Sequence, residues 1–205
     1  WPLASGMMTR VPLTLMLCIS VIFAAGEAEG RRHNSRCVLK NPPADDGVLL
    51  STFTTRFSAR AYKRAANVRR AGLRLDGAQI RKGGMLSYNR LVGPRDAHSG
   101  FLPAPAIDSG QLVDKTGGGA CQPSSTLHAA ALFAGLGVEE RSEHTLLSAY
   151  IGAGLDASVV YGLKDLVVKN PYPFPIRLAA EVGERHLTVR ILGQRGRKGW
   201  VEIQT

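Results

Sequence analysis

Cysteine and aromatic residues are scarce in this 205-residue chain: it contains three cysteines, and aromatic residues make up 6% of it. So few cysteines exclude a disulfide framework. Hydrophobic residues make up 44% and charged residues 20%, a composition typical of a globular protein that excludes a disordered chain, a collagen-like repeat and a polytopic membrane protein. The length predicts one domain, or one domain with a tail.

Acidic residues are also in short supply. The chain has 16 Asp and Glu against 26 Lys and Arg, which gives a net charge of +10. Eleven of the basic residues lie between Arg56 and Arg95, where Asp76 is the single acidic residue. A protein of this charge attracts nucleic acid, acidic lipid head groups or acidic envelope polymers, and charge alone does not choose among them.

The first residues have the pattern of a secretory signal. Arg10 precedes an apolar run, Val11–Ala25, that is shorter than the roughly 20 residues needed to span a bilayer comfortably. We expect a signal peptide over residues 1–26, cleaved after Gly26, with the first six residues lying upstream of the start at Met7 or its neighbour. An uncleaved membrane anchor is the alternative. The pattern predicts a secreted, periplasmic or envelope-associated protein.

The remaining chain divides into an arm and a domain. Residues 27–46 are polar and contain Pro42-Pro43, which predicts a flexible arm, and residues 47–205 are expected to form a single domain. Helices precede strands, so we predict an α+β fold in which helices, including a central one bearing a cysteine, pack on a mainly antiparallel sheet. Helices are predicted over 57–73 and 121–135, a loop-rich segment over 103–119, a hairpin bend at 182–184, and strands at 48–53, 85–89, 158–161, 166–169, 176–181 and 186–192.

Cys121 has the sequence surroundings of a nucleophile. It follows the glycine run Gly117–Gly119 and precedes a predicted helix. The unpaired N–H groups and dipole of a helix N-terminus favour an anion, and they lower the pKa of a thiol placed there. The same groups stabilise a developing oxyanion. The alternatives are a buried structural cysteine and a disulfide with Cys37.

A cysteine nucleophile needs a base and a group that orients it. His128 lies two turns along the same helix, about 10 Å from Cys121 and out of reach. His144 follows the helix after a short link, and Asp156 or Asp165 could orient its ring because both lie next to predicted strands. The order cysteine, histidine, acid is that of papain-like and NlpC-type thiol hydrolases, although no local motif of those families is present.

Other site chemistries fit the sequence less well. Cys121, His144 and Asp156 lack the close spacing of metal ligands, so we expect no metal and no cofactor. The glycine run is not a phosphate-binding loop, because no Gly-Lys-Ser/Thr follows it. The arginine-rich helix lacks interleaved aromatic residues, so we expect no nucleic acid partner. Contact with a membrane is expected only through an uncleaved signal.

The sequence resembles the VanW family, from about Leu50 to Gly193. The Gly-Gly-Gly-x-Cys-Gln-x-Ser-Ser-Thr stretch is the most specific feature. The resemblance rests on Met85–Asn89, Val92–Arg95, Gly117–Leu127, His144, Asp156-Ala157, Tyr161-Gly162, Asp165-Leu166 and Lys169–Pro171.

The resemblance implies a secreted or surface protein of the bacterial envelope, in a family named after an accessory gene of vancomycin-resistance clusters. The chain departs from the family in three ways. Lys82-Gly83 stands where Pro-Gly is frequent, a single His144 stands where a histidine pair is common, and we expect a minimal version of the domain without the β modules that often accompany it.

Two functions from different classes are compatible with these features. The first is a thiol-dependent amide hydrolase or transpeptidase acting on peptidoglycan peptides, with Cys121 as nucleophile, His144 as base and acid, and backbone N–H groups around Gln122 holding the oxyanion. The second is a non-catalytic accessory module that binds peptidoglycan or another anionic envelope polymer. The substrate-binding residues we expect are Gly118, Gly119, Gln122, Ser124, Ser125, Thr126, Asn89, Arg95 and Tyr161.

Overall fold

The computed structural model describes residues 47–108 and 110–194. The expected signal peptide and arm lie outside these residues. The predicted α+β class is confirmed, with three helices and strands that pair antiparallel within the described residues. The elements are β1 (Val48–Arg56), α1 (Tyr62–Leu73), β2 (Gln79–Ile80), β3 (Met85–Ser87), α2 (Tyr88–Val92), β4 (Pro103–Asp108), β5 (Gln111–Thr116), α3 (Cys121–Phe133), β6 (Gly137–Glu140), β7 (Val167–Lys169), β8 (Ile176–Val182) and β9 (His186–Gly193).

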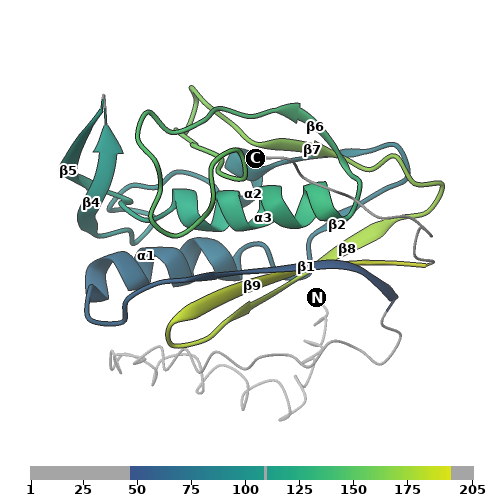
Figure 1. The fold of residues 1–205 in the computed structure, drawn as a ribbon, viewed down its shortest axis with the longest axis horizontal. Coiled ribbons are helices and arrows are strands. Elements are labelled where there is room, and N and C mark those ends of the chain that lie inside the picture. Colours follow the sequence, from purple (N-terminus) through teal and green to yellow (C-terminus); the bar gives the residue numbers. More distant parts are fainter. Residues whose placement is uncertain (1–46, 109, 195–205) are drawn as a thin grey trace, which may run out of the picture. The chain divides into compact units, whose positions relative to one another are not determined.

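The strands form three sheets around one helix. A four-stranded sheet has the order β1-β9-β8-β2, a three-stranded sheet has the order β3-β7-β6, and β4 pairs with β5. Helix α3 contacts β1 and β9 of the larger sheet, β6 of the smaller sheet, and α1. Figure 1 shows α3 lying between the two larger sheets, with the β4–β5 hairpin at one end of the layers. A cysteine at the start of α3 therefore lies close to the hairpin.

The composition of α3 explains its central position. Leu127 and the alanines at 129, 130 and 131 are fully buried, and small side chains let the sheets approach the helix closely. Its hydroxyl residues are buried as well, so the helix has no solvent-facing side from Gln122 to Ala131. A helix whose side chains are apolar, or have hydrogen-bond partners within the protein, on every face is stable in the interior. The predicted helix over 121–135 is confirmed to within two residues.

The sequence pattern also predicted three of the four strands of the larger sheet, β1, β8 and β9, whereas β2 was not predicted. Strands β8 and β9 form the predicted hairpin, with Glu181 opposite Thr188 and the Gly183 N–H donating to the His186 carbonyl at 2.9 Å. Along β8 the buried and partly exposed residues alternate, as the pleat requires. The apolar stripe of α1 is buried at Ala65, Val68 and Gly72.

Three local predictions were wrong in part. Helix α1 begins at Tyr62 instead of Phe57, because the Phe57 N–H donates to the carbonyl of Arg185 at 2.9 Å and ties this residue to the β8–β9 hairpin. The segment 103–119 is a β-hairpin: prolines at 103 and 105 remove N–H donors, and a short edge strand tolerates this. The predicted strand at 158–161 contributes only the isolated bridges Ser142–Ser158 and Val160–Lys164.

The predicted strand at 85–89 ends at Ser87, and α2 begins at the next residue, Tyr88. The Ser87 hydroxyl caps this helix by accepting from the Arg90 N–H at 3.1 Å, and a serine cap favours a helix start over a longer strand. Within residues 47–108 and 110–194, no helix has the length and apolar character needed to cross a membrane.

Candidate active site

Three glycines bring the chain into α3 at Cys121. Gly117 and Gly119 have φ values of +86° and +96°, which L-residues with a side chain rarely adopt. Gly118 passes so close to β4 that a Cβ atom would lie 2.1 Å from the Ala104 carbonyl oxygen. The backbone conformation and the close approach to β4 therefore require glycine at these positions, and the run fixes the position of Cys121 against the hairpin.

His144 is held by the carboxylate of Asp156. Both the backbone N–H and the Nδ1–H of His144 donate to Asp156 Oδ2, at 2.8 and 2.7 Å. The other carboxylate oxygen accepts from Arg141 Nη2 at 2.8 Å, and Arg141 Nε donates to the Asp156 carbonyl at 2.8 Å. The side chains of His144 and Asp156 are 7% and 12% exposed. This arrangement orients the ring and leaves Nε2 as the free ring nitrogen.

The Cys121 thiol meets this ring. His144 acts on the thiol, because its hydrogen-bonding side chain and its charge lower the pKa of Cys121, and the sulfur lies 3.6 Å from the carbonyl oxygen of Val159. Because Nδ1 is bonded to Asp156, Nε2 is the ring nitrogen left for an interaction with the thiol. Cys121, His144 and Asp156 thus form a continuous chain of side chains, whereas Asp165 does not take part in it.

The electrostatics of Cys121, His144 and Asp156 favour a thiolate on Cys121 and an imidazolium on His144. Burial raises the pKa of Cys121, but hydrogen bonds from His144 and the Val159 backbone, with the charges of His144 and Arg95, bring it below the ordinary value. Burial lowers the pKa of His144, and Cys121 and Asp156 outweigh this and raise it. The pKa of Asp156 is lowered because the hydrogen bonds from His144 and Arg141 outweigh burial. A thiolate beside an imidazolium is the reactive form of a cysteine nucleophile.

A cavity of about 540 Å³ opens beside the thiol. Cys121 and His144 lie in its wall, and most of the other lining is apolar. It is enclosed by the end of β1, the start of α1, the β4–β5 hairpin, the glycine run and the segment that follows His144. Its other lining residues are Arg56, Phe57, Ser58, Arg64, Pro105, Ala106, Ile107, Leu112, Gly117, Gly119, Gln122, Leu146, Leu147, Ser148, Ala149 and Tyr150.

The hydroxyl residues expected to contact substrate lie in the interior. Ser124, Ser125 and Thr126 are 0% exposed. Ser124 Oγ donates to the Ala157 carbonyl at 2.7 Å, and Ser125 Oγ accepts from the Ala157 N–H at 2.9 Å. Thr126 Oγ1 donates to the Gln122 carbonyl at 2.8 Å. These hydroxyls fasten α3 to its neighbours, and the Ala157 contacts fix the residue next to Asp156.

Gln122 is placed differently from its expected role. Its backbone N–H donates to the Gly119 carbonyl at 3.0 Å, so this donor is already used within the structure. Its side-chain Nε2 donates to Thr55 Oγ1 at 3.0 Å and to the Arg56 carbonyl at 2.9 Å. The buried Oε1 has no hydrogen-bond partner among the described residues. The Gln122 side chain therefore holds the start of α3 against the end of β1, and its backbone N–H is not available to a substrate.

The remaining expected residues gather around Asn89 of α2. Asp165 accepts from the Asn89 N–H at 2.8 Å and from the Ser87 hydroxyl. Arg95 Nη1 donates to Asn89 Oδ1 at 2.6 Å, and its guanidinium lies 5.8 Å from the centroid of the Tyr161 ring. Asn89, Tyr161 and Asp165 line a separate, open hollow of about 450 Å³. Arg95 links this cluster to Cys121 through its charge.

The sequence analysis did not select three residues of the site: Arg64, Arg141 and Tyr150. Tyr150 lies under the guanidinium of Arg64, 5.6 Å from the ring centroid to Cζ. None of them belongs to a local motif, so no signal in the sequence separates them from other surface residues. In the part of the chain that the structure describes, no group of three or more His, Cys, Asp and Glu side chains is arranged to hold a metal ion.

Comparison with known proteins gives the family. The chain is 34% identical over 132 residues to "Uncharacterized protein YoaR" of Bacillus subtilis (strain 168), an alignment covering 64% of this chain and 44% of that protein. It is 30% identical over 109 residues to "Vancomycin B-type resistance protein VanW" of Enterococcus faecalis (strain ATCC 700802 / V583), covering 51% of this chain and 40% of that protein. The chain thus spans less than half the length of these curated relatives.

No solved structure matches the chain, so the likeness in residue order to papain-like hydrolases stays an expectation. The family model described as VanW like protein matches residues 63–192, which is more than half of the chain and includes Cys121, His144 and Asp156. The chain therefore belongs to the VanW-like protein family.

Proposed function

We propose that this protein is a thiol-dependent amide hydrolase or transpeptidase that acts on peptidoglycan peptides through Cys121. The observation that carries the proposal is that Asp156 binds the His144 ring and that His144 and the Cys121 thiol, which influence each other's pKa, lie together in the wall of a cavity. A nucleophile, a base and a group that orients the base are the three parts that covalent acyl transfer needs. The cavity supplies room for a substrate.

The proposed reaction proceeds in two steps. The Cys121 thiolate attacks the carbonyl carbon of an amide, and a C–S bond forms while the carbonyl oxygen takes negative charge. The His144 imidazolium gives its Nε2 proton to the leaving amine, the C–N bond breaks, and a thioester remains. His144 then takes a proton from water or from an acceptor amine, which attacks the thioester and releases the Cys121 thiolate.

The fixed surroundings of the thiol support the same chemistry. Helix α3 begins at Cys121, so this residue lies at the positive end of the helix dipole. Since the Gln122 N–H is engaged with Gly119, the backbone donor expected there is not part of the proposed oxyanion site. Asp156 acts as a positioning residue, because it fixes the ring orientation and the Nδ1 tautomer.

The envelope setting rests on the family. A relative carries the name of a vancomycin resistance protein, and the family resemblance implies secreted or surface proteins of bacteria. We therefore propose a secreted or periplasmic location and peptidoglycan peptides as substrates. The positive charge of the chain suits contact with an anionic envelope polymer.

The test is turnover of purified peptidoglycan stem peptides, followed by mass spectrometry of the peptides and of the protein. We expect a cleaved or transferred product and a covalent acyl adduct on Cys121. Cys121→Ala should abolish both, and His144→Ala should reduce both by at least a hundredfold, about the contribution of general acid–base catalysis. His98→Ala is the matched control, because His98 is an exposed histidine that does not line the cavity beside Cys121.

Equal turnover by the parent and by Cys121→Ala would refute the proposal. Absence of turnover, together with binding of the same peptides that is unchanged in Cys121→Ser, would favour the non-catalytic binding module instead.

A further inference from the structure

Arg64 lines the cavity beside Cys121. It lies in the first turn of α1, its guanidinium stacks over the ring of Tyr150, and its charge acts on the Cys121 thiol. Gly119 makes room for it, since a Cβ at that position would lie 2.8 Å from Arg64 Cγ. Because the glycine run has no side chains, both the thiol and this arginine can line the same cavity.

The other arginines of α1 have hydrogen-bond acceptors. Arg69 donates to the Glu184 carbonyl at 2.9 Å and Arg70 donates to the Ser99 carbonyl at 3.3 Å, and Arg74, which caps the end of the helix, donates to the Val92 carbonyl. In the part of the chain that the structure describes, the Arg64 guanidinium has neither a hydrogen bond nor an ion pair, and burial lowers its pKa. A partly buried cation without a neighbouring anion is energetically unfavourable, and a bound anionic ligand would supply the missing counter-charge.

The residues around Arg64 indicate which kind of ligand would bind there. The cavity wall is mostly apolar, and it includes Phe57, Ile107 and Leu146. No carboxylate lines the cavity within residues 47–108 and 110–194. A fitting ligand thus carries an anion and apolar atoms, the combination found at the carboxyl end of a peptide.

We infer that Arg64 binds a free carboxylate of the acyl substrate, and that it selects peptides that carry a carboxylate close to the amide bond attacked by Cys121. The planar guanidinium fork matches a carboxylate through two parallel N–H···O bonds. The inference rests on the proposed function only in taking Cys121 as the reacting atom.

The experiment compares two reagents that attack the same thiol and differ in charge. Iodoacetate carries a carboxylate and iodoacetamide a neutral amide, and in both cases the Cys121 sulfur displaces iodide. The rates are measured on the full chain with Cys18→Ser and Cys37→Ser, as the parent, and are divided by those of a free thiol. We expect the normalised iodoacetate-to-iodoacetamide ratio to fall about tenfold in Arg64→Gln, the loss expected for one charge-assisted pair, and to be partly retained in Arg64→Lys.

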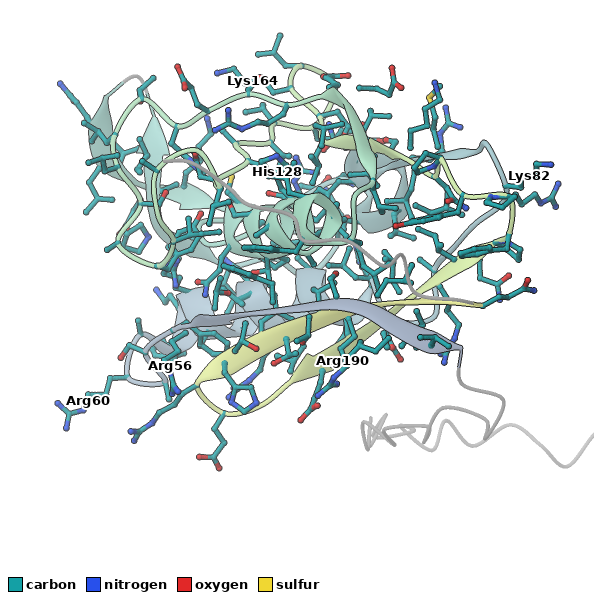
Figure 2. The ribbon with its side chains drawn as sticks, turned by 45° about the vertical axis from the view of Figure 1, so that its right-hand side comes forward. Arg56, Arg60, Lys82, His128, Lys164 and Arg190 are labelled. Carbon is teal, nitrogen blue, oxygen red and sulfur yellow. The ribbon has the colours of Figure 1, made fainter. Side chains whose placement is uncertain are left out.

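Two controls isolate Arg64. Arg60→Gln removes an equal charge from an exposed residue outside the cavity lining, which Figure 2 shows at the outer edge of the molecule, and it should leave the ratio unchanged. A second measurement needs no variant at position 64. N-acetylalanine should slow iodoacetamide labelling of the parent, whereas N-acetylalaninamide, which lacks the carboxylate, should not.

The outcomes separate the two proposals. A reactive Cys121 with the same ratio in the parent and in Arg64→Gln, or equal protection by the two alanine compounds, would overturn the role of Arg64 and leave the nucleophile intact. A thiol that reacts with neither reagent would overturn both. A ratio that falls equally in Arg60→Gln would show a general effect of charge and would also overturn the inference.

Discussion

The reactivity of Cys121 should depend on His144, and the pH dependence of its alkylation measures this directly. The perturbation is His144→Ala, in a chain whose other cysteines are replaced by serine. The substitution removes the hydrogen bond and the positive charge that lower the pKa of the thiol, but it leaves the burial that raises it. We therefore expect the pKa of Cys121 to move to the ordinary thiol value or above it.

The size of the effect follows from the thiolate fraction. A thiol with an ordinary pKa of about 8.5 is roughly 0.3% ionised at pH 6 and roughly 24% ionised at pH 8. Its alkylation rate with iodoacetamide therefore rises about 75-fold over this interval. In the parent the thiolate is already favoured, so the rise should be much smaller. Each pKa unit separating the two proteins corresponds to about 1.4 kcal/mol of interaction between Cys121 and His144.

The assay is iodoacetamide labelling followed by mass spectrometry between pH 5 and pH 9, with unfolding curves to show that each variant is folded. His98→Ala, at an exposed position, is the control and should follow the parent. A steep parent profile that His144→Ala does not change would refute the reasoning, because it would mean that the ring does not stabilise the thiolate.

Asp156→Asn should lower the free energy of unfolding by about 2–4 kcal/mol, because it removes a carboxylate that is 12% exposed and accepts from His144 and Arg141. The pKa of Asp156 is lowered in the fold, so its contribution is present above pH 4 and is lost as the pH falls through the folded value; thermal melts of parent and variant should converge at low pH. Gly118→Ala should destabilise the protein by more than about 3 kcal/mol or prevent folding, since its Cβ would meet a β4 carbonyl at 2.1 Å. Gly152→Ala, where nothing lies within 4 Å, should be nearly neutral in the same melts. Ser125→Ala should cost about 1–3 kcal/mol in urea unfolding, because it leaves the buried Ala157 N–H without its acceptor; an unchanged midpoint would contradict this.

Local features of the fold could be predicted from the sequence because they depend on neighbouring residues. The alternation of apolar residues in β8 and β9 and the glycine between them specify a hairpin whatever surrounds it. The small residues after Cys121 likewise specify a closely packed helix. Prolines at 103 and 105 concealed β4, since an edge strand is the exception to the rule that proline interrupts strands.

The arrangement of the candidate site was decided by contacts between distant residues. Asp156 and Asp165 both lie next to predicted strands and could not be told apart by position. Only the tertiary structure places Asp156 against His144, while Asp165 binds the N–H of Asn89 at the start of α2.

The same reason explains Arg64. In the sequence it is one of several basic residues on a helix, and its distinguishing feature is the cavity formed by α1, the hairpin and the segment after His144. The sequence by itself determined that a cysteine stands at the start of a buried helix, since that needs only the glycine run and the residues that follow. Which ring, carboxylate and guanidinium meet the thiol was decided by the tertiary structure, because burial and charge act through space between segments that are far apart along the chain.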